Sequence, residues 1–299
     1  MKTLVVGGTG MIGGAAALHL KELGHEVTIA GRNAPQAGTP LGNLPFQRID
    51  YVAMDFDRDA LAAHDAMVFC AGNDIRHVPA DEDDGFWEKA NSIGVPRFFE
   101  AARDAGIGRA VNVGSFYPQA MPSLVETNAY VRSRKESDDG VTALATSGFV
   151  PMSINAPFVL GSVPELVVPM FAAYTQYAEG KLGMEEFVPP GGTNFISTRS
   201  LAEAVAGGLE RGEAGASYLV GDENLTFQDY FGMFFEAVGR EKPPIIEKEH
   251  PMLPDSALFF GRGNTLYYET DPQTVALLDY QRNDVKRAVE EIVAQYRGG

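Results

Sequence analysis

Three side chains between positions 115 and 134 have the types and spacing that a carbonyl reduction requires. Ser115 follows an apolar stretch, and Tyr130 and Arg134 stand four positions apart further along the chain, so that on a helix they share one face. A phenol can donate a proton to a carbonyl oxygen as hydride arrives, a nearby cation lowers the pKa of that phenol, and a serine hydroxyl polarises the carbonyl. Ser115, Tyr130 and Arg134 are therefore the candidate catalytic residues.

Each of these residues has a simpler interpretation when it is taken alone. A tyrosine on a helix surface usually packs against its neighbours, and a serine after a strand usually caps the next helix. The catalytic hypothesis therefore depends on the three together and on a hydride donor nearby. Tyr117, two residues after Ser115, is the alternative proton donor.

The first thirty-three residues have the pattern of a site for such a hydride donor. An apolar strand at 1–6 runs into a glycine-rich turn, which is followed by a helix at 11–23 and a second strand at 25–30. Glycines spaced in this way allow a tight turn, a close approach to a pyrophosphate and close packing of the helix, whose first N–H groups attract phosphate. The turn that is expected to hold the cofactor consists of Gly7, Thr9, Gly10, Met11, Ile12 and Gly13.

The end of the second predicted strand indicates which dinucleotide binds. A site that prefers NAD places Asp or Glu there to bond the ribose hydroxyls, whereas this chain has Ala30, Gly31 and Arg32. A guanidinium pairs with the 2′-phosphate of NADP and finds no equivalent group in NAD. We therefore expect NADP as the cofactor, with NAD less favoured. The simpler interpretation of Arg32 is a solvated arginine in a loop.

Two later strand ends complete the predicted cofactor site. The sequence predicts a third strand over 46–55, which would place Asp55 beside the adenine, and a short helix at 59–63. A fourth strand over 65–71 is nearly continuous in apolar residues, as a buried parallel strand should be. Ala71 and Gly72 at its end are then expected to face the cofactor.

Strands and helices continue to alternate with short connections, which predicts a doubly wound parallel sheet of the Rossmann type in an α/β fold. Further strands are expected at 109–113 and 152–156, with the helix around Trp87 and a helical stretch to residue 105 before them. After residue 157 the spacing becomes irregular. The prediction is a dinucleotide-binding domain of residues 1–157 and 195–220, and a smaller, discontinuous substrate-binding region of residues 158–194 and 221–299.

Composition excludes several classes of partner. The net charge of −16 argues against nucleic acid and anionic membranes, because both require a basic footprint. Cys70 is the single cysteine and the five histidines lack paired ligand spacing, so neither a disulfide framework nor a metal site is expected. No apolar run reaches the length of a membrane span, and Met1 leads directly into a strand, which leaves no room for a signal peptide. A cytoplasmic protein is expected.

These motifs together resemble the extended short-chain dehydrogenase/reductase superfamily, in its NAD(P)-dependent epimerase/dehydratase branch. The resemblance implies that Ser115 binds the carbonyl and that Tyr130 is the acid and base. The matching stretches are Gly7, Gly10 and Gly13, residues 90–94, 98–102, 111–115, 126–127 and 130–134, and later 155–161, 195–205 and 218–225.

The chain departs from the family pattern at two places. Arg134 stands where the family's Tyr-x-x-x-Lys motif has lysine, and arginine supplies a permanent charge but cannot relay a proton. Residues 153–157 replace the Arg-x-Phe-Asn type of stretch found in members that act on sugar nucleotides. The segment 158–194 contains one basic residue, Lys181, so a diphosphate would find little to bind. The segment does contain five aromatic residues that could line an apolar pocket or pack in a core: Phe158, Phe171, Tyr174, Tyr177 and Phe187.

Three functions follow from these observations. The first is an NADP-dependent oxidoreductase that reduces a ketone or aldehyde of a largely apolar small molecule, or oxidises the alcohol. The second is a sugar-nucleotide epimerase or dehydratase, and the third is a regulatory protein that senses NADP without catalysis, which the lysine-to-arginine difference keeps open. A small molecule is the expected partner, and a homodimer is left open.

Overall fold

Seven short strands form the central sheet of the computed structural model, which describes residues 1–73 and 85–297. Their order is β3-β2-β1-β4-β5-β6-β9, and every neighbouring pair is parallel. The inner strands are buried on both faces, as their continuous apolar runs predict. The doubly wound α/β fold is therefore confirmed. The strands are β1 (Lys2–Val6), β2 (Glu26–Gly31), β3 (Phe46–Arg48), β4 (Ala66–Phe69), β5 (Arg109–Ser115), β6 (Val150–Ala156) and β9 (Ser217–Leu219).

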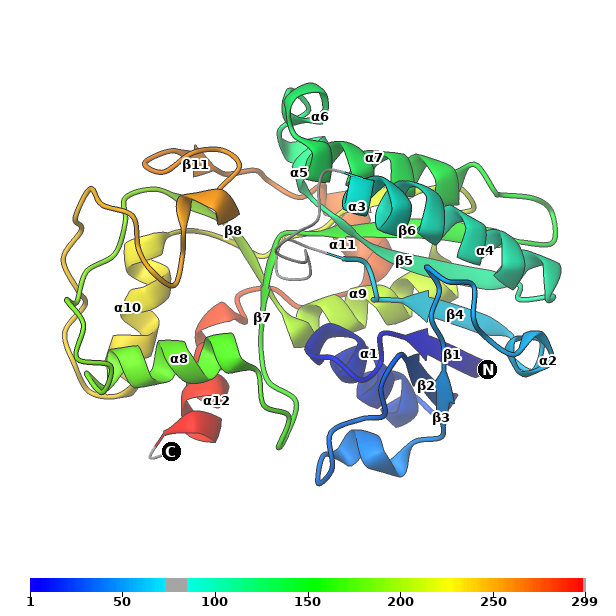
Figure 1. Cartoon of the computed structure of the whole chain (residues 1–299), viewed down its shortest axis with the longest axis horizontal. Helices are drawn as coiled ribbons and strands as arrows, with labels where there is room; N and C mark the ends of the chain where they lie inside the picture. Colours follow the sequence, from blue (N-terminus) through cyan, green and yellow to red (C-terminus); the bar gives the residue numbers. More distant parts are fainter. Residues whose placement is uncertain (74–84, 298–299) are drawn as a thin grey trace.

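Helices cover both faces of this sheet (Figure 1). On one face, α1 (Met11–Glu22) packs against α9 (Thr198–Arg211), and α11 (Pro272–Leu278) packs on α9. On the other face, α4 (Gly94–Asp104) packs against α7 (Ala129–Thr142). Shorter helical segments connect these elements: η1 (Pro40–Asn43), α2 (Arg58–Leu61), α3 (Gly85–Trp87), the π-helical η3 (Glu88–Ile93), α5 (Tyr117–Ala120) and α6 (Leu124–Thr127).

A second, smaller lobe lies beyond the carboxyl ends of the central strands (Figure 1). Its sheet has the order β10-β8-β11, with β7 also paired to β8. Three helices pack around this sheet over a core that is rich in phenylalanine and tyrosine. The elements are β7 (Phe158–Leu160), α8 (Pro169–Ala178), β8 (Gly192–Ser197), β10 (Glu223–Thr226), α10 (Phe227–Ala237), η4 (Asp255–Ala257), β11 (Thr265–Leu266) and α12 (Val285–Tyr296).

The third strand is much shorter than predicted, because it ends at Arg48 and not at Asp55. The Asp50 carboxylate accepts hydrogen bonds from the backbone N–H groups of Val52 and Ala53, which closes a turn. Met54 then has a left-handed backbone with φ of 56°. The strand prediction over 46–55 was wrong because local side-chain bonding outweighed the apolar pattern.

Residues 195–197 also differ from their predicted place. The sequence assigns residues 195–220 to the dinucleotide-binding domain, but β8 pairs with β7, β10 and β11 in the second sheet. The remainder of that range supplies α9 and β9 to the central unit. Within the described ranges, no helix is long and apolar enough to cross a membrane.

Candidate active site

The glycine-rich turn between β1 and α1 has two glycines that the protein itself requires. A Cβ on Gly7, whose φ is +83°, would lie 2.7 Å from the Cys70 carbonyl carbon. A Cβ on Gly13 would lie 2.3 Å from the Gly7 carbonyl oxygen, so only glycine lets α1 approach the turn this closely. Both residues serve internal packing.

Gly10 differs from these two glycines, because no protein atom crowds it. A Cβ there would meet only the Gly7 carbonyl oxygen, at an ordinary contact distance of 3.6 Å. Gly10 is exposed, and it is the N-cap of α1 with no side-chain cap. The space beside Gly10 and the N–H groups of the first helical turn therefore form a cradle that a phosphate group fits.

Two arginines lie near the phenol of Tyr51 in a chain of net charge −16. Arg32 follows β2 and is exposed, whereas Arg134 is buried in α7. Burial raises the pKa of Tyr51 to about 12, and the charges of Arg134 and Arg32 act against this rise, so both lie within electrostatic reach of that phenol.

Asp55 and Thr9 lie near the same end of the site as Arg32. The Asp55 carboxylate pairs with Arg48 at 2.6 Å, and its side chain is 60% exposed. Thr9 lies beside the end of β2, since a Cβ on Gly31 would be 3.1 Å from the Thr9 hydroxyl oxygen. An adenine contact by Asp55 stays a prediction.

Ser115 and Tyr130 are brought together by β5 and α7. Ser115 is the last residue of β5 and is buried, and its Oγ accepts a bond from the Tyr117 backbone N–H at 3.5 Å. Tyr130 lies in the first turn of α7, which the Asn128 side chain caps by accepting from the Val131 N–H at 3.0 Å. Both hydroxyl-bearing residues line one cavity.

Arg134 occupies the lysine position of the motif and is fixed by its surroundings. Its side chain is 8% exposed, and it donates a hydrogen bond to the Val113 carbonyl at 3.0 Å. The guanidinium carbon lies 6.0 Å from the centre of the Tyr130 ring. A Cβ on Gly72 would come within 2.9 Å of the guanidinium, so the glycine after β4 makes room for this larger cation.

A buried amide network, which the sequence analysis did not foresee, supports this arrangement. The Asn91 side chain exchanges two hydrogen bonds with the Asn73 backbone, both at 3.2 Å, and donates to the Ser133 hydroxyl. Asn73 in turn donates to the Tyr51 phenol at 2.7 Å. Asn91 lies in the π-helical η3, a type of segment that is frequent at functional sites. The network joins the end of β4 to α7, and the Asn in the 90–94 motif was the signal that could have indicated it.

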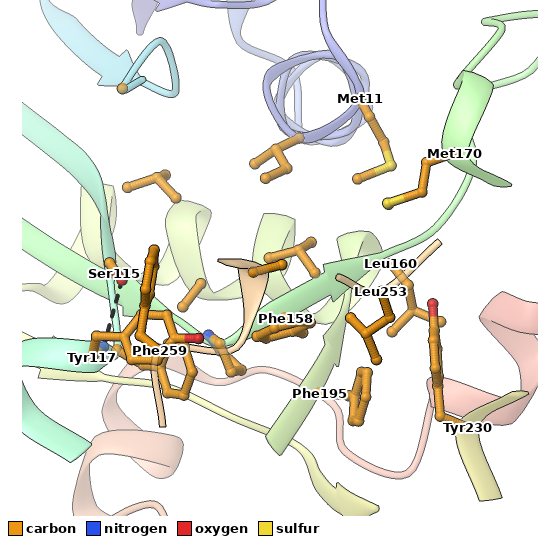
Figure 2. A pocket seen from close by; sticks show the side chains of 18 of the residues that line it. Met11, Ser115, Tyr117, Phe158, Leu160, Met170, Phe195, Tyr230, Leu253 and Phe259 are labelled. Atoms are coloured by element: carbon orange, nitrogen blue, oxygen red, sulfur yellow. Dashed lines mark hydrogen bonds between the residues drawn. The ribbon is translucent and has the colours of Figure 1, made fainter. Parts of the chain in front are cut away.

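The cavity has a volume of about 440 Å³ and lies between the central sheet and the smaller lobe. Figure 2 shows Ser115, Tyr117 and Phe259 at one end, and Met170, Leu253 and Tyr230 at the other. Among the lining residues that the structure describes, Arg134 is the only charged one. An apolar body with one or a few polar atoms fits such walls.

The sequence-predicted residues divide between the cavity and its surroundings. Met11, Ile12, Gly72 and the catalytic candidates line it, whereas Ala71 packs against the core. Of the five aromatics in 158–194, Phe158 and Tyr174 line the cavity, and the other three are buried in the core of the lobe. Phe116, Tyr117 and Phe195 also line the cavity. Further aromatic side chains come from α10 and the 252–259 segment, which the sequence analysis missed: Phe227, Tyr230, Phe231 and Phe259.

Comparisons with known proteins agree with this fold. The model of the family described as "NAD dependent epimerase/dehydratase family" matches residues 3–221. A Synechocystis sp. protein, a dihydroflavonol 4-reductase by provisional assignment, is 25% identical in an alignment of length 265 that covers 80% of this chain and 73% of that protein.

Solved structures show the same architecture at lower identity. The crystal structure of gox2253 superposes with a TM-score of 0.77 at 22% identity and covers 99% of this chain and 98% of its own. A UDP-glucose-4-epimerase from Stenotrophomonas maltophila, solved with NAD and formylated UDP-arabinopyranose, has a TM-score of 0.76 at 17% identity, with coverage of 99% and 98%. These likenesses establish the fold alone.

Proposed function

Because the chain belongs to the NAD dependent epimerase/dehydratase family, we propose that it reduces a ketone or aldehyde on a largely apolar small molecule with NADPH, or oxidises the corresponding alcohol. The observation that carries this proposal is the cavity itself. The hydroxyl-bearing residues Ser115, Tyr117 and Tyr130 and one fixed cation, Arg134, lie on the side of the sheet, and apolar and aromatic side chains make up most of the remaining wall.

The residues at the sheet end of the cavity have the chemistry for the proton side of this reaction. The nicotinamide supplies or accepts the hydride when the cofactor is bound. Ser115 donates a hydrogen bond to the carbonyl oxygen, and Tyr130 donates the proton that turns this oxygen into a hydroxyl. Arg134 favours the ionised form of the phenol by its charge and offers donors for a ribose hydroxyl.

Arg32 supports the choice of NADP over NAD. It follows β2 and is exposed, and the structure gives it no carboxylate partner within the described ranges. A bound 2′-phosphate would therefore meet an available guanidinium there. NAD is the alternative, in line with the family's description and with the NAD in the Stenotrophomonas structure.

The charge of the cavity favours an apolar substrate over a sugar nucleotide. A diphosphate needs cations or oriented N–H groups beyond those used by the cofactor, and the described walls of the lobe carry no lysine or arginine. The alternative function, a sugar-nucleotide epimerase or dehydratase, is supported by the description of the family. We also propose a cytoplasmic location, since a single cysteine suits a reducing compartment.

A substrate panel tests the proposal. The purified protein is mixed with NADPH and aryl ketones or aldehydes, and separately with UDP- and dTDP-sugars, while cofactor absorbance and sugar products are followed. We expect NADPH oxidation with the apolar carbonyl compounds and no conversion of the sugars. Conversion of a sugar nucleotide with no ketone reduction would establish the epimerase reading. Tight NADP binding with no turnover of any compound would establish the sensor.

A further inference from the structure

Tyr117 is the first residue of α5, directly after the strand that carries Ser115. Its ring is 4% exposed and is held between aromatic neighbours, with centroid distances of 4.3 Å to Phe116, 5.2 Å to Phe259 and 6.4 Å to Phe260. Its backbone N–H donates to the Ser115 hydroxyl. The bond holds the Tyr117 backbone, and the aromatic packing holds its side chain on the cavity wall (Figure 2).

The Tyr117 hydroxyl is buried and has no hydrogen-bond partner among the residues that the structure describes. The Phe259 backbone approaches it but lies outside hydrogen-bond geometry. A buried hydroxyl without a partner destabilises a protein, so such a group is uncommon and needs a reason. Tyr117 lines the substrate cavity, and a small shift of the side chains around its closed hydroxyl would let a ligand supply the missing partner.

The reacting carbonyl does not account for this third hydroxyl. Under the proposed function, Ser115 and Tyr130 already donate to the carbonyl oxygen. Tyr130 and Tyr117 both pack on the Phe259 ring, at 5.3 Å and 5.2 Å between centroids. The two phenols therefore belong to the same end of the cavity, and a second oxygen near the carbonyl of the substrate would reach Tyr117.

We propose that Tyr117 is a substrate-binding residue whose phenol donates a hydrogen bond to a second oxygen of the substrate. The preferred substrates are then apolar aromatic carbonyl compounds with an oxygen function beside the reacting carbonyl. This inference rests on the proposed function. It assigns Tyr117 to binding and not to proton transfer, in contrast to its role as the alternative proton donor.

The electrostatics agree with a donor that does not ionise. Burial, with a smaller contribution from Tyr130, raises the pKa of Tyr117 well above its usual value. The hydroxyl therefore keeps its proton throughout the pH range in which the protein is folded. A neutral, permanent donor recognises a hydroxyl, ether or carbonyl oxygen, whereas a general acid must release its proton and recover it.

Three ketones that differ by one oxygen test this inference. The value of kcat/KM with NADPH is measured for acetophenone, α-hydroxyacetophenone and ortho-hydroxyacetophenone, in the unmodified protein and in Tyr117→Phe. One neutral hydrogen bond predicts a preference of roughly tenfold for at least one hydroxylated ketone. Tyr117→Phe should lose this preference, so that the ratio of kcat/KM between the hydroxylated ketone and acetophenone falls to about one.

A stability measurement tests the unpartnered hydroxyl without any substrate. In the protein without ligand, Tyr117→Phe should unfold at the same urea concentration as the unmodified protein or at a higher one. Tyr268→Phe is the matched control, because the Tyr268 hydroxyl donates to the Val220 carbonyl at 2.7 Å and its loss should lower the midpoint. A fall in the Tyr117→Phe midpoint as large as that of the control would overturn the inference.

The outcomes separate this inference from the proposed function. Equal kcat/KM for the three ketones in the unmodified protein, or an unchanged preference in Tyr117→Phe, overturns the assignment of Tyr117 and leaves ketone reduction intact. Failure of all three ketones in the unmodified protein overturns the proposed function, and the inference with it.

Discussion

The two substitutions Gly10→Ala and Gly13→Ala should separate cofactor binding from folding. In Gly13→Ala the new Cβ would lie 2.3 Å from the Gly7 carbonyl oxygen and 2.9 Å from the Gly8 nitrogen, so the backbone must move. Overpacking of this kind costs roughly 1–3 kcal/mol of folding free energy or more. We expect Gly13→Ala to be clearly destabilised even without cofactor.

Gly10→Ala should change the free energy of unfolding by no more than about 0.5 kcal/mol. The new Cβ meets one atom at 3.6 Å, and the extended backbone of Gly10, with φ of −97°, suits alanine. Alanine is a poorer N-cap than glycine, which costs several tenths of a kcal/mol of stability. Alanine also lowers the conformational entropy of the unfolded chain, which stabilises the folded protein by about 0.4–1 kcal/mol. The two effects nearly cancel.

Cofactor binding to Gly10→Ala should be weak, because the methyl group would occupy the space of the pyrophosphate. An overpacking cost of about 1–3 kcal/mol corresponds to a rise in Kd of roughly 5- to 150-fold. Isothermal titration with NADP and urea unfolding without ligand measure the two quantities. If Gly10→Ala binds NADP as tightly as the unmodified protein, the phosphates do not lie against Gly10, and the cradle is wrongly assigned.

Arg32→Ala should weaken NADP binding by roughly tenfold or more and leave NAD binding unchanged, since only NADP carries the 2′-phosphate. Titration with both cofactors measures the two Kd values. An equal change in both Kd values would remove the basis for NADP preference. Arg134→Lys should keep turnover within about tenfold at neutral pH. Arg134→Met should move the pH optimum of alcohol oxidation to a higher pH, because the Tyr130 phenol loses its positive neighbour. An unchanged optimum in Arg134→Met would contradict the role of the charge. Burial among aromatic rings lowers the pKa of His250 to about 4 from 6.5, so its neutral form contributes stability that is present above pH 6.5 and is lost as the pH falls toward 4. The loss amounts to about 3 kcal/mol of the free energy of unfolding. Urea unfolding between pH 6.5 and pH 4 should show a smaller fall of this free energy for His250→Phe than for the unmodified protein. Equal falls in the two proteins would refute the role of His250 in the pH dependence.

The sequence predicts best what short-range patterns determine. The strands β1 and β4 are continuous apolar runs, and the glycine turn and α1 follow from residue types at fixed spacing, so these elements lie where expected. Ser115, Tyr130 and Arg134 share the cavity because β5 and α7 are neighbours in a doubly wound sheet. The order of strands makes this juxtaposition predictable.

What the sequence does not predict depends on contacts between distant segments. The side-chain bonds of Asp50 end the third strand early, although the apolar pattern continues. Tyr230 and Phe259 reach a cavity whose other wall lies more than a hundred residues earlier in the chain, and local periodicity contains no information on that contact. Asn91 was visible in a motif, but its partner Asn73 is set by the tertiary fold.

The most direct test of the account is the effect of Tyr130→Phe on turnover and on cofactor binding in the same preparation. Phenylalanine keeps the ring packed against Trp87 and Phe259, at 5.0 Å and 5.3 Å, and removes the proton donor alone. We expect ketone reduction to fall by about 10²- to 10⁴-fold while the Kd for NADPH stays within about twofold. Turnover at the unmodified rate in Tyr130→Phe would contradict the assignment of Tyr130 as the general acid.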